Sequence, residues 1–183
     1  MPTSYETERL FLRTLAPAQA GAVLDYFARN RSFLAEWEPA RDDAFFTIAA
    51  QQKHLQDDQR RQEAGDLLRL WIFKKSDALT IIGSLAFDHI VRGAFLSCHL
   101  GYRLDEKEIN RGYASEAIQR GIAIMFGEFK LHRIEANVMP RNRRSLRVLE
   151  KLGFYNEGPA PKYLKINGRW EDHIHMVLLN EEV

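Results

Sequence analysis

The chain has 183 residues, of which 45% are hydrophobic and 28% are charged, and its formal net charge is +1. This length and composition predict one globular domain with a sizeable core. A net charge so close to zero gives no overall electrostatic reason to bind nucleic acid. No apolar run approaches the roughly 18 residues of a membrane span, and the first residues lack a signal-peptide core. With Cys98 as the single cysteine, no internal disulfide can form, and we expect a cytoplasmic protein.

The first third of the chain predicts a strand followed by two helices. Residues 9–15, RLFLRTL, have the composition of a short strand, and Pro17 is well placed to open a helix. Pro39 then breaks the helical pattern inside the segment FLAEWEPARDD, residues 33–43. A polar helix is expected over residues 49–65.

Strands dominate the middle of the chain. Apolar runs at 67–75, 80–90 and 94–104 are separated by short turn sequences and predict three strands in succession. A helix is predicted from about 113 to 130, because its apolar residues recur every three or four positions.

The last third repeats the change from strand to helix and ends in two strands. We expect a strand at 132–139, a helix at 143–153, and a pair of strands at 162–171 and 173–179. The Asn-Gly pair at 167–168 is a strong hairpin signal. These elements predict one α+β domain built on a central sheet.

The segment EINRGYASEA, residues 108–117, leads from a predicted strand into a predicted helix. The first amides of a helix have no intrahelical acceptors and lie at the positive end of its dipole. Gly112 would let an anion reach those amides, and Ala114 keeps the next position small. The three-glycine dinucleotide pattern and the Gly-Lys-Ser/Thr loop are both absent. An ordinary turn and a phosphate site therefore both remain open for this segment.

A second junction of this kind lies in NVMPRNRRSLRVLEKLGF, residues 137–154. Asn142 is a preferred N-cap residue, with Ser145 three positions later. The helix is rich in arginine and lysine, which fits either a solvated face or contact with an anion. Two such junctions suggest one shared ligand.

The motifs NRGYASEA and NRRSLRVLEKLGF, in this order, resemble the acetyl-CoA site of the GCN5-related N-acetyltransferase (GNAT) superfamily. TERLFLR resembles the first strand of that family, LGYRLD its fourth, and YLKINGRWEDH its C-terminal strands. NRSFLAEWEP and HIVRGAF resemble the ribosomal-protein-alanine N-acetyltransferases in particular. The resemblance implies a single N-acetyltransferase domain over residues 1–183. It also implies a mixed, mostly antiparallel, twisted sheet flanked by helices, with acetyl-CoA as co-substrate.

The resemblance also implies which residues hold acetyl-CoA. The strand around Tyr102 and Leu104 would pair with the pantetheine arm, and Asn142 would hold that arm from the other side. Arg147 and Lys151 would lie near the nucleotide phosphates. The pyrophosphate would be bound by main-chain amides of the loop, those of Asn110, Arg111, Gly112, Tyr113 and Ala114.

The sequence departs from the family pattern at three positions. Ile109 stands where the family has glutamine or arginine, and Asn110 stands where close relatives have glycine. Because main-chain amides need no particular side chain, these two departures bear on affinity more than on the existence of the site. Asn137 matches a glutamate of related N-terminal acetyltransferases, and an amide cannot take a proton.

The implied chemistry is attack of an amine on a thioester. It needs a neutral amine, a polarised carbonyl and a proton for the departing thiolate. Ser145 is the predicted proton donor, with a helix-start residue as the alternative. Glu135 shares a strand face with Asn137 and is the predicted general base. A structural salt bridge at Glu135, His99 as base, and deprotonation through water stay open, while Cys98 is expected to be packed in a strand.

The run of Asp172, His173 and His175 has the residue types of a metal site. Strand alternation sends Asp172 to one face and the two histidines to the other. We therefore expect no metal.

The segment FLAEWEPARDD follows the first helix, where the superfamily builds one wall of its acceptor cleft. Phe33 and Trp37 would form an apolar floor, although Trp37 could equally pin the segment to the core. Glu38, Asp42 and Asp43 would supply negative charge for an amine and for basic residues after it.

The resemblance implies transfer of an acetyl group to a primary amine by direct attack. The expected acceptor is the N-terminal α-amine of a protein such as a ribosomal protein. An acetyltransferase for a small-molecule amine and a non-catalytic acyl-CoA-binding module are the alternatives. We expect a monomer or homodimer without nucleic-acid or membrane partners.

Overall fold

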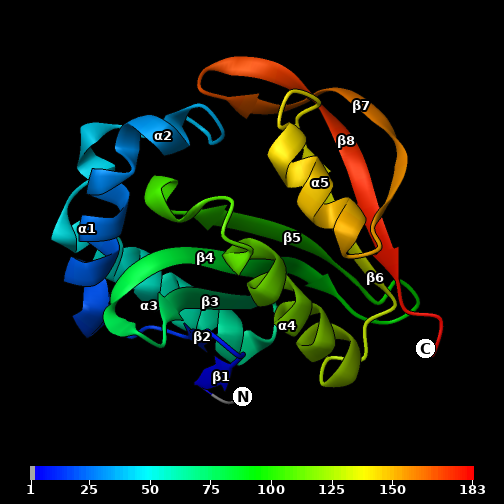
Figure 1. The fold of residues 1–183 in the computed structure, drawn as a ribbon, viewed down its shortest axis with the longest axis horizontal. Coiled ribbons are helices and arrows are strands. Elements are labelled where there is room, and N and C mark those ends of the chain that lie inside the picture. Colours follow the sequence, from blue (N-terminus) through cyan, green and yellow to red (C-terminus); the bar gives the residue numbers. More distant parts are fainter. Residues whose placement is uncertain (1–2) are drawn as a thin grey trace.

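An eight-stranded sheet runs through the protein in the order β1-β2-β3-β4-β5-β6-β8-β7 (Figure 1). The computed structural model describes residues 3–183. Neighbouring strands are antiparallel except β5 and β6, which are parallel. The strands are β1 (Ser4–Glu6), β2 (Leu10–Arg13), β3 (Leu67–Lys74), β4 (Asp77–Val91), β5 (Ser97–Leu104), β6 (Arg133–Val138), β7 (Tyr155–Ile166) and β8 (Arg169–Leu179). The helices are α1 (Ala20–Arg29), α2 (Arg31–Ala35), α3 (Ile48–Ala64), α4 (Tyr113–Gly127) and α5 (Arg143–Lys151), with short 3-10 turns η1 (Pro17–Gln19), η2 (Asp43–Phe45) and η3 (Glu106–Glu108).

The predicted α+β fold with a mixed, mostly antiparallel sheet is confirmed. Two short elements, β1 and α2, were not predicted, because three and five residues are too few to show a periodic pattern. The predicted bounds of the last two strands, 162–171 and 173–179, were wrong, since β7 spans Tyr155–Ile166 and β8 spans Arg169–Leu179. The turn between them contains Asn167 and Gly168 with φ of 42° and 81°, the left-handed backbone that an Asn-Gly hairpin turn requires.

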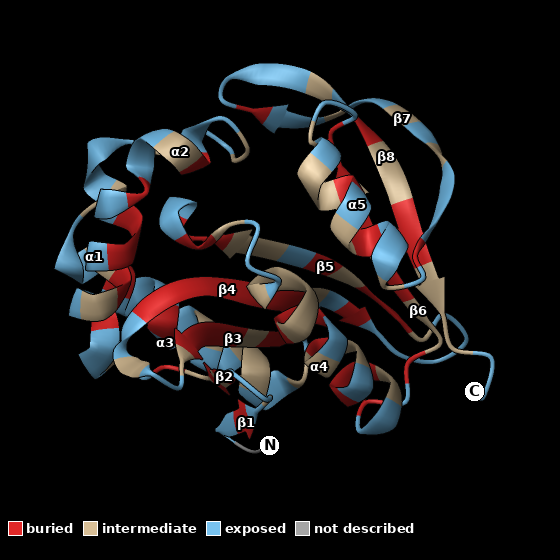
Figure 2. Cartoon of the chain, viewed as in Figure 1, coloured by how far each residue is buried: buried red, intermediate tan, exposed pale blue. Residues whose placement is uncertain are grey.

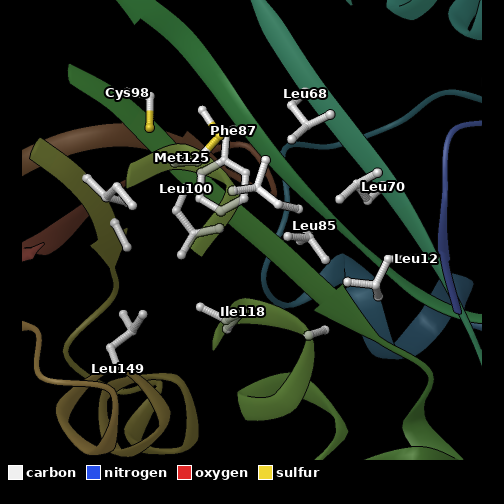
Figure 3. Close-up of a cluster of buried hydrophobic side chains, with 14 of the residues drawn as sticks. Leu12, Leu68, Leu70, Leu85, Phe87, Cys98, Leu100, Ile118, Met125 and Leu149 are labelled. Carbon is white, nitrogen blue, oxygen red and sulfur yellow. The ribbon is translucent and has the colours of Figure 1, made fainter. Parts of the chain in front are cut away.

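Helices cover both faces of the sheet. In Figure 1, α4 and α5 lie in front of the strands and α3 lies behind them. The core under α4 and α5 joins side chains of β2 to β6 with those of the two helices (Figure 3). Cys98 is fully buried in this core, and burial raises the pKa of its thiol to about 12. This environment agrees with the expected packing role for Cys98 and makes it a poor nucleophile.

A second core fills the space between α1, α3 and the other face of the sheet. Tyr26, Phe27 and Trp71 form edge-to-face contacts there, with ring centroids 5.4 to 6.1 Å apart. Figure 2 shows β3 and β4 as buried strands, whereas much of the outer hairpin strand β7 is exposed. Among the described residues, no helix has the length and apolarity needed to cross a membrane.

The parallel strands β5 and β6 stay paired for only three residues. Ser97 to His99 pair with Arg133 to Glu135, and no later residues of the two strands are paired. Up to Leu104, β5 continues with β4 on one side only, while β6 continues with β8 on its far side. The main chain of residues 100–104 therefore has an unpaired edge, at the carboxyl end of a parallel pair of strands. Ligand sites of α/β proteins are commonly formed at such ends.

Candidate active site

A cavity of about 680 Å³ occupies the place where β5 and β6 separate. Its wall includes both Tyr102 and Arg103, which are adjacent in β5 and therefore point to opposite faces of the sheet. Tyr102 packs toward the α4 and α5 side, whereas the guanidinium of Arg103 lies over the Phe27 ring on the α1 side. The cavity thus reaches both faces of the sheet, and two reactants could meet from opposite sides.

The loop before α4 offers a row of free main-chain amides to this cavity. Asn110 and Gly112 both have left-handed backbone, with φ of 61° and 81°. Within the described residues, no amide from Asn110 to Ser115 donates a hydrogen bond. Amides of this kind at a helix start bind anions. Asparagine is among the residues that best tolerate a left-handed backbone, so Asn110 can replace the glycine of the family pattern.

Arg9 holds this loop in place, a role that was not predicted from the sequence. Its guanidinium pairs with Glu116 at 2.7 Å and donates to the Arg111 carbonyl at 3.1 Å. A Cβ added to Gly112 would lie 3.3 Å from Arg9 Nη2. Arg9 and Glu116 are separated by 107 residues, and no local pattern marks such a pair.

The start of α5 brings Asn142 and Ser145 to the cavity wall, together with Arg147 and Lys151. The side-chain oxygen of Asn142 accepts a hydrogen bond from the Ser145 amide at 3.1 Å, which is the N-cap arrangement. The Ser145 and Tyr102 hydroxyl oxygens are 2.7 Å apart. Burial raises the pKa of the Tyr102 phenol to about 12, so this group keeps its proton at neutral pH.

Glu135 lies away from the cavity wall, in an ion-pair cluster. Its carboxylate contacts Arg133 at 2.7 Å and His175 Nδ1 at 2.7 Å. Burial alone would raise the pKa of Glu135, but the hydrogen bonds from Arg133 and His175 lower it to about 2. A carboxylate with so low a pKa is a weak base, and this environment argues against the predicted catalytic role. His99 is also outside the cavity wall, 3.8 Å from Glu135.

Phe33, Trp37 and Glu38 all line the cavity on the α1 and α2 side. Each aromatic ring is contacted by an arginine near the start of α5. The Arg144 guanidinium lies over Phe33 and that of Arg141 over Trp37, each 5.7 Å from the ring centroid. These contacts connect the α2 segment to the α5 side of the cavity.

The negative charge expected on this wall is already engaged within the protein. Glu38 pairs with Arg41 at 2.6 Å and with Arg103 at 3.2 Å. Asp43 pairs with an arginine at 2.6 Å, and Asp42 accepts a main-chain hydrogen bond as the cap of η2. The part of these carboxylates in binding a basic acceptor stays a prediction, but Glu38 does not present a lone negative charge to the cavity. The group of Glu38 and its two arginines carries a net charge of +1 instead.

His173 is a cavity residue that the sequence did not single out for this site. It is 3% exposed and lies on the same strand face as His175, with the Tyr163 ring close to both imidazoles. Asn137, on the neighbouring strand, also lines the cavity. Alternation along β8 identified this shared face, but only the pairing of β6 with β8 places it beside the cavity.

Comparison with known proteins identifies the family. The acetyltransferase (GNAT) domain model matches residues 9–155. The [ribosomal protein uS5]-alanine N-acetyltransferase of Escherichia coli (strain K12) is 38% identical over 168 residues, which cover 92% of this chain and 86% of that protein. The crystal structure of ribosomal-protein-S5-alanine acetyltransferase from Vibrio fischeri has a TM-score of 0.93 and 37% identity, covering 99% and 98% of the two chains. Mycobacterium smegmatis RimJ in complex with CoA-disulfide has a TM-score of 0.89 and 27% identity, covering 95% and 83%.

The geometry of the cavity fits the co-substrate of that family. The free amides from Asn110 to Ser115 suit a pyrophosphate, and the unpaired edge of β5 suits the amide-rich pantetheine arm. The chain belongs to the GNAT acetyltransferase family and is an acetyl-CoA-dependent N-acetyltransferase.

Proposed function

We propose that this enzyme acetylates the N-terminal α-amine of a protein, with ribosomal proteins as the substrate class. Two relatives that align along almost the whole chain are named for a ribosomal-protein alanine, whereas a spermidine acetyltransferase of Vibrio cholerae matches only 39% of the chain. The structure adds a physical reason to favour an α-amine, which lies in the charges around the cavity.

The carboxylates that line the cavity are Glu38 and Glu108. Glu38 is held by two arginines, and Glu108 pairs with Lys74 at 2.6 Å. Neither carboxylate is free to act as a strong base. An α-amine has a pKa near 8 and a lysine side chain one near 10.4, so at neutral pH the α-amine loses its proton at about 3 kcal/mol lower cost. The absence of an unpaired carboxylate on the described cavity wall is the observation that carries this proposal.

The acetyl-CoA side of the proposal rests on main-chain groups. The amides of Asn110, Arg111, Gly112, Tyr113 and Ala114 would hold the pyrophosphate, and Arg147 and Lys151 would lie near the nucleotide phosphates. The pantetheine arm would run along the unpaired edge of β5, beside Tyr102 and Leu104, with Asn142 opposite. When bound, acetyl-CoA supplies the thioester carbonyl that the amine attacks.

Two neighbouring hydroxyl groups would serve the departing thiolate. Ser145 would donate its proton to the sulfur, and Tyr102 would orient the Ser145 hydroxyl through their 2.7 Å contact. Because Tyr102 keeps its proton at neutral pH, it can replace the proton that Ser145 gives up. Cys98 takes no part, since it is fully buried in the core.

The proposal is tested with three acceptors in parallel, assayed with purified enzyme and acetyl-CoA. The first is a peptide with an N-terminal alanine and one internal lysine, the second is the same peptide with a blocked N-terminus, and the third is spermidine. We expect mass spectrometry to find one acetyl group on the N-terminus of the first peptide and slow or no reaction of the other two. Faster reaction of the blocked peptide would identify a lysine acetyltransferase, and reaction of spermidine alone a small-amine enzyme. Acetyl-CoA binding without transfer to any amine would identify a binding module.

A further inference from the structure

The imidazole of His173 is held with a defined proton position. Its Nδ1 lies 3.0 Å from the main-chain oxygen of Glu171. A carbonyl oxygen can only accept, so Nδ1 carries the proton and Nε2 carries the lone pair. Nε2 forms no hydrogen bond within the described residues, and the side chain borders the cavity. His173 therefore presents an acceptor nitrogen at the site where the reactants would meet.

The surroundings of His173 keep this imidazole neutral at physiological pH. Burial lowers the pKa of His173, and the nearby His175 lowers it further, while Glu171 and Asp172 act in the opposite direction. The Glu171 carboxylate is itself paired with Arg141 at 2.9 Å. From β7 the neutral ring of Tyr163 faces the imidazole, with centroids 5.6 Å apart.

A second acceptor lies beside His173 on the same face of the sheet. Asn137 pairs with His175 across β6 and β8, which makes it a diagonal neighbour of His173. Its Nδ2 donates to the Tyr163 hydroxyl at 3.3 Å, and its Oδ1 is buried without a partner among the described residues. A buried polar atom without a partner in a cavity wall is commonly satisfied by a ligand or by water. A primary amine has N–H groups to donate to both acceptors.

We propose that His173 is the general base that takes the proton lost by the acceptor amine, and that Asn137 Oδ1 holds a second N–H of that amine. This inference rests on the amine acetylation proposed above. The amine nitrogen forms a bond to the thioester carbon, and the positively charged nitrogen then passes one proton to Nε2 of His173. The carbonyl electron pair, which moved to oxygen during the attack, returns as the C–S bond breaks with its electron pair on sulfur. The thiolate takes a proton from the Ser145 side, and the Tyr102–Ser145 pair regains a proton from solvent. His173 returns to neutrality by releasing its proton to solvent.

This assignment explains how the site works without a carboxylate base. Forming the C–N bond removes the nitrogen lone pair and makes the N–H far more acidic, so a weak base suffices at this step. A neutral imidazole is well matched to that task at pH 7, whereas Glu135, with a pKa of about 2, is not.

The test compares His173→Gln with His175→Gln. The two histidines are two residues apart on one strand face, and only His173 lines the cavity. Glutamine can accept a hydrogen bond near the position of Nε2 but cannot take the proton. A second variant, His173→Asn, keeps a donor near the position of Nδ1 for the Glu171 carbonyl. It tests the same role if His173→Gln fails to fold. Each variant is assayed with the amine that the wild type accepts best, so that a wrong acceptor class does not affect the comparison.

We expect both His173 variants to lower kcat about 100-fold at pH 7, the lower end of general base catalysis, with KM and acetyl-CoA affinity nearly unchanged. The difference in kcat between wild type and these variants should shrink as the pH rises toward 9, because hydroxide from solvent then takes the proton in place of Nε2. His175→Gln should keep kcat within about 3-fold of the wild type, as expected for a residue outside the proton path. A loss in the His173 variants no larger than in His175→Gln, or a loss that is the same at every pH, would overturn the assignment.

Discussion

The hydroxyl oxygens of Tyr102 and Ser145 lie 2.7 Å apart, although the two residues are separated by 43 positions in the chain. Tyr102 comes from β5 at the unpaired edge, and Ser145 comes from the first turn of α5. Their contact closes one wall of the cavity on the α5 side of the sheet. Either oxygen can be the donor, so the pair can pass a proton along without moving its heavy atoms.

Replacing Ser145 with alanine removes the hydroxyl and leaves the main-chain amide that Asn142 caps. If Ser145 donates the proton to the leaving thiolate, kcat should fall by about 10- to 100-fold or more. Acetyl-CoA affinity, measured by calorimetry, should change little, because this interaction matters mainly in the transition state. Equal losses of affinity and kcat would identify Ser145 as a co-substrate contact only.

Tyr102→Phe removes the partner of Ser145 and keeps the aromatic ring. We expect a smaller fall in kcat than for Ser145→Ala, since the serine hydroxyl remains. In a double-mutant cycle, Tyr102→Phe should lower kcat hardly any further once Ser145 is alanine, because the two groups act as one unit. Tyr155→Phe is the matched control, as Tyr155 is 45% exposed on β7 and outside the cavity wall. Fully additive losses would show that the two hydroxyl groups act independently.

Gly112→Val should weaken acetyl-CoA binding by at least about 10-fold. A side chain at this left-handed position is strained by roughly 1–2 kcal/mol, and it would also cover the free amides. Gly65→Val is the matched control, because Gly65 has a φ of 79° at the end of α3 and does not line the cavity. Both variants should lose comparable thermal stability, but only the Gly112 variant should lose acetyl-CoA affinity. Unchanged affinity in that variant would remove the pyrophosphate site from the loop.

The net positive charge around Glu38 should make the enzyme sensitive to charge in the acceptor peptide. We expect peptides with glutamate near the N-terminus to have a KM about 2- to 5-fold lower than peptides with lysine there, the size expected for partly exposed ion pairs. Arg103→Gln should abolish this difference, and added salt should reduce it. Arg60→Gln, an exposed change on α3, should leave the difference intact. A preference for lysine-containing peptides in the wild type would contradict this electrostatic picture.

Glu135 should contribute to stability rather than to the chemical step. Its folded-state pKa of about 2 lies below the ordinary value of 4.5. Its contribution to the free energy of unfolding is therefore fully present above pH 4.5 and is lost as the pH falls toward 2. The wild-type melting temperature should therefore fall more steeply over this pH range than that of Glu135→Gln. At pH 7 the variant should be less stable, with kcat close to that of the wild type. A variant that is inactive but equally stable would restore Glu135 as the base.

The acetyl-CoA-binding part of the cavity could be predicted from the sequence, because it depends on local features. A glycine before a helix and an asparagine N-cap each fix their own backbone, and both lie at the cavity in the structure. The hairpin at Asn167 and Gly168 was predictable for the same reason, since its turn depends on two adjacent residues.

The acceptor side could not be predicted in the same way, because its chemistry is set by pairs that are distant in the chain. No local pattern marks the ion pair between Glu38 and Arg103, which are 65 residues apart. Glu135 looked like a base because strand alternation gives the face of the sheet but not the neighbours on that face. The cavity position of His173 depends on the pairing of β6 with β8, and no short motif reports that pairing.

The three residue pairs between β5 and β6 are the seam of the sheet, because they alone join its first five strands to its last three. Across so short a seam, side-chain packing holds the two parts of the sheet together, because the core under α4 and α5 includes residues from β2 to β6 and from β8. The width of the cavity beyond the seam is therefore set by this packing, since no main-chain pairing joins β5 to β6 there.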